Sequence, residues 1–344
     1  MKTVSQSSKT GLALIMVMVA IFTLSVLVGA FAYAMKVETK LAQTANNGET
    51  LIWLGRSGVE QAKAILAQGT CRYEALNQKW AGGTGSECET NGAFTDLPME
   101  NVPLGEGTFS IKIRDLERKI NLNSAPEALI RNAIESIGLS QGEAAMVEDG
   151  ILDWMDPNPN SNVKRANGAK TEFYQSLEPP YSAKNGPIDD MSELLLIRGI
   201  TQDNFWGPSS TNHSESYFQR RNQPRRGAIQ QAEYTAGLED VFTMMGGPVN
   251  VNTASREVLL AIPGINETIA DQIIQSRSEA PFINAVETIN AGAPSAISQY
   301  CGVNSRTFEV QVEAEVGGTR KTFYGIVGKA VGAKSFQVLS FYWK

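Results

Sequence analysis

The sequence predicts an α+β protein in which a long amino-terminal helix packs on an antiparallel sheet, with a large α-helical domain inserted between two parts of that sheet. An uncharged apolar run covers Leu12–Met35, and short alternating segments lie on either side of a long interval, Asn121–Tyr300. That interval carries helical patterns and a duplicated motif. A chain of 344 residues is long enough for two domains beyond a membrane helix.

The apolar run Leu12–Met35 is long enough to cross a membrane. At about 1.5 Å per residue it extends roughly 36 Å, against a hydrocarbon core of about 30 Å. The only charges in the preceding segment, Met1–Thr10, are Lys2, Lys9 and the amino terminus. Cations on this short side predict a single-pass membrane protein with a cytoplasmic amino terminus and an extracytoplasmic body.

The position of Gly11 distinguishes this segment from a secretory signal peptide, in which a shorter apolar run precedes a small-x-small cleavage site. Here the glycine precedes the run and closes a leader at residues 1–11, as it does in type IV prepilins. The resemblance implies that a prepilin peptidase cuts between Gly11 and Leu12, methylates Leu12 and leaves the helix on the mature chain. Prepilins usually have phenylalanine at that first mature position.

Helical periodicity continues after the membrane segment, with apolar positions at intervals as far as Leu66. Gly48, Gly55 and Gly58 interrupt it, and each weakens a helix by about 1 kcal/mol relative to alanine. We therefore expect residues 12–68 to form one long, bendable helix, half in the membrane and half packed on a globular head.

The head is predicted in two parts, residues 69–119 and 301–344. The first part is rich in turns and ends in an alternating strand. In the second part apolar residues alternate on one face, and a Gly-Gly pair favours a hairpin turn. The strands are expected at Thr108–Arg114, 308–314, Lys321–Val327 and Phe336–Tyr342, with the turn at Gly317-Gly318.

Three cysteines are present, and none forms a Cys-x-x-Cys pair. Cys71 and Cys88 flank a glycine-rich segment. In an oxidising periplasm a disulfide between them would stabilise the fold by about 3 kcal/mol. The alternative is that they are buried free thiols, because connectivity cannot be read from sequence. Cys301 is left without an obvious partner.

Residues 120–300 are predicted to form the inserted helical domain from two similar units. The stretch INLNSA at 120–125 recurs as VNVNTA at 249–254. Ser124 and Thr253 are expected to cap the helices that follow, which continue through glycine-containing turns into further helices. Between the units, residues 207–227 carry four arginines and few large apolar residues. We expect a solvated loop there, with a basic contact patch as the alternative.

Motifs spread over almost the whole chain resemble those of K-type minor pseudopilins of type II secretion systems. They are the prepilin-like start, DLERKINLN at 115–123, ILDWMD at 151–156, PPY at 179–181, MSEL at 191–194 and VNVNTA at 249–254. The resemblance implies a pilin-like head with an inserted SAM-like helical domain. It also implies a non-catalytic subunit that caps the pseudopilus tip with the I-type and J-type minor pseudopilins during export of folded proteins. A minor pilin of a type IV pilus is the alternative within this structural class.

Most pilins have a glutamate at the fifth mature position, where this chain has Met16. An unpaired acid in a bilayer costs about 2.5–3.5 kcal/mol or more, so that glutamate needs a partner, the charged amino terminus of the subunit above it. A tip subunit has no subunit above it, and Met16 is therefore consistent with a place at the tip. A simple membrane anchor would also have an apolar residue here.

Five oxygen-bearing side chains form a candidate calcium site. Four of them lie within eight residues, three of these at alternate positions as at the opening of a calcium loop, and the fifth is close enough in sequence to complete a different cage. They are Asp153, Asp156, Asn158, Asn160 and Glu172. The loop is not an EF-hand, because Ser161 replaces the sharp-turn glycine. Calcium is associated with this insert in the resembled family. The alternative is a turn with Asx-type hydrogen bonds and no ion.

A DNA-binding helix-hairpin-helix protein, or a competence-type membrane protein, is the strongest alternative from another class. Leu259–Asn266 resembles the hairpin motif, but Asn266 replaces the second glycine of the usual Gly-x-Gly. Residues 249–280 hold two arginines against four acids, and the whole chain has a net charge of −6. Phosphate contacts are therefore disfavoured and no nucleic-acid partner is expected.

An enzyme is not expected either. The one histidine, His213, lies in the polar loop, and the sequence has no nucleophile elbow, P-loop or zinc pattern.

Overall fold

The computed structural model describes residues 9–68, 71–86, 88–89, 97–160, 163–207, 235–330, 332 and 335–343. The polar loop expected at 207–227 lies, after Gly207, outside these residues, as do leader residues 1–8 and the side chains of Gly11 and Leu12.

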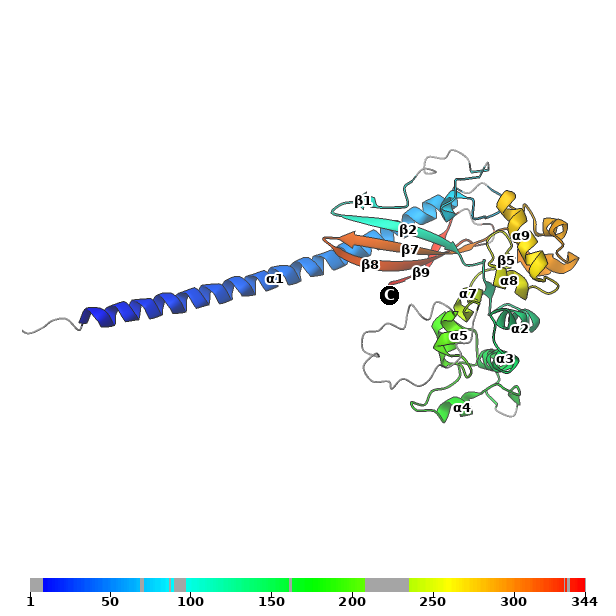
Figure 1. The fold of residues 1–344 in the computed structure, drawn as a ribbon, viewed down its shortest axis with the longest axis horizontal. Helices are drawn as coiled ribbons and strands as arrows, with labels where there is room; N and C mark the ends of the chain where they lie inside the picture. The colour runs from blue at the N-terminus through cyan, green and yellow to red at the C-terminus, as the bar shows by residue number, and fades with distance from the viewer. Residues whose placement is uncertain are drawn as a thin grey trace, which may run out of the picture.

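The chain begins with a very long helix, α1 (Lys9–Ala67), whose first half extends away from the rest of the molecule (Figure 1). Its apolar amino-terminal half is exposed, and it is the one described helix that is long and apolar enough to cross a membrane. From Leu51 onward one face of α1 becomes buried against the sheet through Leu54, Val59, Ala62 and Leu66. The helix therefore combines an apolar stalk with a packed head segment, as the sequence predicts.

The sheet has five antiparallel strands in the order β1-β2-β7-β8-β9. They are β1 (Val102–Leu104), β2 (Gly107–Asp115), β7 (Thr307–Val316), β8 (Thr319–Gly328) and β9 (Gln337–Trp343). Although β2 and β7 are far apart in sequence, they are neighbours, with Asp115 opposite Phe308. The hairpin between β7 and β8 turns at Gly317 and Gly318, whose φ angles of 56° and 79° suit the positive values of a two-residue hairpin turn.

The inserted domain leaves the sheet after β2 and returns before β7, so both of its connections lie at the same end of the sheet. This end is distal to the membrane helix, since the opposite end, at Gly317, lies beside Asn47 of α1. Trp80, near the distal end, packs edge to face on Phe308 with ring centroids 5.1 Å apart. The pilin-like α+β fold with a helical insert is confirmed (Figure 1).

The insert consists of two units of the same plan, each closed by a short parallel pair of strands, β3 with β4 and β5 with β6. The first contains β3 (Ile120–Asn121), α2 (Glu127–Ser136), α3 (Gln141–Met155), α4 (Thr171–Gln175), η3 (Met191–Leu196), α5 (Gln202–Trp206), α7 (Leu238–Val241) and β4 (Phe242–Thr243). The second contains β5 (Val249–Asn250), α8 (Arg256–Ala261), α9 (Glu267–Glu279), η5 (Ala285–Ala291), η6 (Ser295–Gln299) and β6 (Cys301–Gly302). A further short helix, η1 (Lys79–Ala81), precedes the sheet.

The duplicated motif makes the same hydrogen bonds in both units. The side-chain amide of the second asparagine of each copy forms two hydrogen bonds with the backbone of one distant residue: it accepts that residue's N–H and donates to its C=O. Asn123 forms this pair with Ile188, at 2.8 Å each, and Asn252 forms it with Phe282, at 2.9 Å each. The first asparagine accepts the backbone N–H of the second, at 3.1 Å in one copy and 3.0 Å in the other. Asparagine is required because its amide both donates and accepts.

The predicted helix caps are wrong by two residues. The helices begin at Glu127 and Arg256, with Pro126 and Ser255 at the N-cap positions. Ser124 lies instead in a turn in which its N–H donates to the Asn121 carbonyl. The Thr253 hydroxyl is used elsewhere, on the carboxylate of Asp115. The motif residues therefore form the turn before each helix, and the N-cap is a residue that follows the motif.

Candidate functional site

The head and the insert meet at a buried group of polar residues, the junction cluster, formed by Glu74, Asp115, Glu117, Asn250, Thr253 and Ser305. Asp115, at the end of β2, accepts hydrogen bonds from the hydroxyls of Thr253 at 2.5 Å and Ser305 at 2.6 Å. Asn250 donates to the Glu74 carbonyl at 3.0 Å and to the Ser305 hydroxyl at 2.8 Å. The second copy of the motif thus joins the insert to the head.

The three carboxyls of the junction cluster have no salt bridge to a described cation, and hydrogen bonds from hydroxyl, amide and backbone donors satisfy them. Ser305 N–H donates to Glu74 at 2.8 Å, and Arg306 N–H donates to Glu117 at 3.1 Å. Burial raises the pKa of Asp115 and of Glu117, and burial together with these two neighbouring acids raises the pKa of Glu74 to about 7. Burial at the junction therefore shifts the pKa of all three carboxyls upward.

We predict that thermal stability falls as pH rises from 5 to 8. Between about 4.5 and about 7 the folded state binds more protons at Glu74 than the unfolded state does, so each increase in pH favours unfolding. The effect is at most about 3 kcal/mol. The pKa values of Asp156 and Asp271 are lowered, so these groups titrate below this range. Glu74→Gln should raise the melting temperature at pH 8 and flatten its pH dependence; an unchanged profile would contradict the assignment.

The residues of the predicted calcium site lie at the end of α3 and in the loop that follows. Asp153 is buried, Asp156 is the C-cap of α3, and Asn158 and Asn160 are exposed in successive turns. The N–H of Asn158 donates to the Asp156 side chain at 3.1 Å, and the N–H of Asn160 donates to the Asn158 side chain at 3.0 Å. These are Asx-type turns, the alternative that the sequence left open.

The fifth predicted ligand, Glu172, is exposed in the first turn of α4. Lys170, which sequence reasoning missed, lies between the two aspartates instead, with Nζ 2.7 Å from Asp156 Oδ2 and 3.9 Å from Asp153 Oδ1. Among the described residues no group of three or more acids, histidines or cysteines is arranged to hold a metal ion. These residues do not fit a calcium cage in this arrangement, and calcium binding stays a prediction.

Cys71 and Cys88 form a disulfide with their Cα atoms 5.1 Å apart. It closes the loop that follows α1. Cys301 is a buried free thiol in β6, and burial raises its pKa to about 12. A thiol with so high a pKa is protonated at neutral pH and is therefore unreactive.

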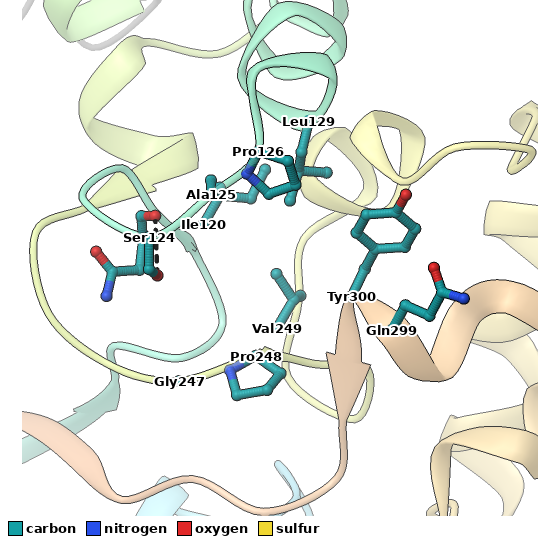
Figure 2. A pocket seen from close by; sticks show the side chains of 11 residues that line it. Ile120, Ser124, Ala125, Pro126, Leu129, Gly247, Pro248, Val249, Gln299 and Tyr300 are labelled. Atoms are coloured by element: carbon teal, nitrogen blue, oxygen red, sulfur yellow. Dashed lines mark hydrogen bonds between the residues drawn. The ribbon is translucent and has the colours of Figure 1, made fainter. Parts of the chain in front are cut away.

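A cleft of about 440 Å³ lies between the two units of the insert (Figure 2). One wall is the start of α2, with Pro126 and Leu129, and the facing wall includes Pro248, Val249 and Tyr300. Its lining is mostly apolar and contains no carboxylate, histidine, lysine or arginine. The cleft therefore offers surface for contact, without a set of groups for acid–base or nucleophilic chemistry.

The helix-hairpin-helix part of the second unit places acids beside its arginine. Arg256 donates to Asp271 at 2.8 Å and to Glu267 at 3.3 Å, so its guanidinium is already paired. Asn266 caps α9 by accepting the N–H of Ile269 at 2.9 Å, and Gly264 makes the turn with φ of 85°. The hairpin packs helices together, and with two arginines against four acids in residues 249–280 it does not attract phosphate.

Among the described residues, the strand at one edge of the sheet has no further strand beside it and carries exposed apolar side chains. Strand β9 is the last strand in the sheet order, and Leu339 and Trp343 on it are 55% and 53% exposed. Trp53, 59% exposed on α1, lies under the guanidinium of Arg56, which also approaches the Phe341 ring at 5.8 Å. An exposed strand edge beside exposed aromatic rings is typical of a surface that other subunits cover.

Two family models match the chain. Residues 111–205 match the family described as "Type II secretion system (T2SS), protein K", and residues 246–291 match the helix-hairpin-helix motif. The chain is 21% identical over 342 residues to type II secretion system protein K of Aeromonas hydrophila, covering 90% of each protein. It is 23% identical over 252 residues to the protein of that name from Pseudomonas aeruginosa, covering 69% of this chain and 66% of that protein.

A solved structure has a similar fold. It is the crystal structure of the GspK-GspI-GspJ complex from the enterotoxigenic Escherichia coli type 2 secretion system, in which the matched chain gives a TM-score of 0.60 at 14% sequence identity. The match covers 88% of this chain and 99% of that chain. Most of this chain therefore adopts a fold that already occurs in a solved protein.

Proposed function

Because the chain belongs to the type II secretion system protein K family, we propose that it is the minor pseudopilin that caps the tip of the pseudopilus and starts its assembly. In this role it helps export folded proteins across the outer membrane and catalyses no reaction. The GspK-GspI-GspJ complex supports the I-type and J-type minor pseudopilins as its partners.

The observation that carries the proposal is where the insert lies. Both of its connections leave the sheet at the end distal to the membrane, near the Asp115–Phe308 pair. A filament that grows from the membrane stacks each new subunit beneath the older ones, so the distal end of every internal subunit contacts the subunit above. A domain of about 180 residues, Ile120–Gly302, at that end leaves no room for such a contact, and only a terminal subunit can carry it.

The membrane segment supports the same place in the filament. Met16 lies in the apolar stalk of α1, where an internal pilin subunit would use a glutamate to pair with the amino terminus above it. Before assembly the stalk anchors the subunit in the inner membrane, with its body in the periplasm. The disulfide between Cys71 and Cys88 is consistent with that oxidising compartment.

We further propose that a prepilin peptidase cleaves between Gly11 and Leu12 and methylates Leu12. Gly11→Ala is expected to leave the precursor at its full mass in cells with an active peptidase, and to reduce secretion to the level of a strain that lacks the protein. Gly48→Ala makes the same change at a position of α1 where nothing lies within 4 Å of the added Cβ, and this variant should be processed and functional. Normal processing of the Gly11 variant would contradict the peptidase step, and normal secretion by an unprocessed variant would contradict the role in secretion.

A further inference from the structure

Lys170 provides a buried positive charge at the end of α3. Its side chain is 1% exposed, as is Asp153, so this ammonium and this carboxylate are both removed from water. Burying such charges is costly unless each is paired and hydrogen-bonded. Lys170 Nζ donates to Asp156 Oδ2 at 2.7 Å and to the Asp153 carbonyl at 3.2 Å, and it lies 3.9 Å from Asp153 Oδ1. We call these three residues the Lys170 cluster.

The oxygens around this ammonium are of the kind that would bind a calcium ion. Two carboxylates and a backbone carbonyl are hard oxygen donors, which Ca²⁺ takes at 2.3–2.6 Å. Here the Asp156 carboxylate and the Asp153 carbonyl lie at hydrogen-bond distance from the Lys170 nitrogen, and the Asp153 carboxylate lies 3.9 Å from it. The positive charge that the aspartates need is therefore supplied by a side chain that is covalently part of the protein.

The chain leaves no space for a second cation at Asp153. The N–H of Arg165 donates to its two carboxylate oxygens at 3.1 and 3.3 Å. The backbone also passes so close that a Cβ added to Gly168 would lie 2.0 Å from Asp153 Oδ2. A dication at this carboxylate would also lie within a few ångströms of the ammonium, which would repel it.

The Lys170 cluster joins the two ends of the loop between α3 and α4, as a bound ion would. Asp153 holds the far end of the loop through Arg165, Asp156 caps α3, and Lys170 connects both to the start of α4. Lowering of the Asp156 pKa by the ammonium agrees with this pairing. Burial raises the pKa of the Asp153 carboxyl, and the Arg165 N–H and the Lys170 ammonium act in the opposite direction, as partners of its charged form do.

We propose that the Lys170 ammonium takes the place of a divalent cation in this loop, so that the first unit of the insert folds here without calcium. Stability of the subunit would then not follow the calcium concentration outside the cell. The inference concerns the fold of the insert and does not depend on the proposed place at the filament tip.

The test is thermal unfolding of the full-length chain in detergent, with 5 mM CaCl₂, 5 mM MgCl₂ or 5 mM EGTA. For the wild type we expect the same melting temperature in all three, within about 1 °C. Lys170→Met keeps the length of the side chain but removes its charge, and should lower the melting temperature by about 6 °C or more. Lys164→Met is the control, because Lys164 is exposed in the same loop, and should change little.

Two further variants complete the test. Lys170→Ala opens space beside both aspartates. The melting temperature of this variant should rise partly toward the wild-type value in calcium and should not rise in magnesium. If Lys170→Met does not fold, Asp156→Asn replaces it, because the Asp156 side chain is 39% exposed and tolerates the change. Its loss of stability should be equal with calcium and with EGTA. The proposal is overturned if calcium stabilises the wild type and Asp156→Asn abolishes that gain, or if Lys170→Met is as stable as Lys164→Met.

Discussion

Replacing Asn252 with alanine is expected to lower the free energy of unfolding by about 3 kcal/mol, because two buried backbone groups lose their partner. Asn252 is 2% exposed, and its amide satisfies both the N–H and the C=O of Phe282. Water cannot replace these hydrogen bonds at a site that the insert encloses. The change would be measured as a shift of the urea midpoint of the full-length protein.

Asn123→Ala provides an internal comparison. Asn123 makes the same pair of hydrogen bonds to Ile188 but is partly exposed, so its loss should cost less. Asn290→Ala is the control, because Asn290 is exposed, and should change stability by less than about 0.5 kcal/mol. Equal midpoints for Asn252→Ala and Asn290→Ala would show that the motif does not stabilise its own unit in this way.

Placing a methyl group on Gly58 should destabilise the head by about 1–3 kcal/mol, since it would overpack the face between α1 and the sheet. A Cβ at Gly58 would lie 2.5 Å from a methyl carbon of Val312 and 3.3 Å from the Phe109 ring. Gly58, and Gly55 beside Phe323, therefore allow the helix to approach the strands closely, which outweighs their lower helix propensity.

Gly48→Ala is the matched change on the same helix. Nothing lies within 4 Å of the position of its Cβ, so this variant should be unchanged or more stable by up to about 1 kcal/mol. The two variants would be compared by urea unfolding followed by near-ultraviolet circular dichroism, which reports the packing of the head. The packing argument fails if both glycines tolerate alanine equally.

Much of the fold could be predicted because its signals are local. The apolar length of α1, the alternation from Phe308 to Ala314 and the Gly317-Gly318 turn each depend on a few consecutive residues. The repeated Asn-x-Asn motif predicted two units, although the helices begin later than expected. Helix caps depend on which side chains the turn has already used, and the sequence does not show this.

The parts that could not be predicted depend on contacts between distant segments. Lys170 follows Asp153 by 17 residues, and no spacing rule predicts that its ammonium is buried against that carboxylate. Ser305 and Asp115 are 190 residues apart, and only the pairing of β2 with β7 brings them together. Sequence reasoning identified the oxygen-rich loop but could not find the cation that the fold supplies to it.

The central claim, a tip subunit that assembles with two other minor pseudopilins, is tested most directly by co-purification. The full-length chain, tagged at its carboxyl end, would be expressed with the I-type and J-type subunits of the same secretion system and purified in detergent. The account predicts a stoichiometric complex of all three subunits that survives high salt. Elution of the tagged chain alone, with salt-sensitive binding to DNA in its place, would contradict it.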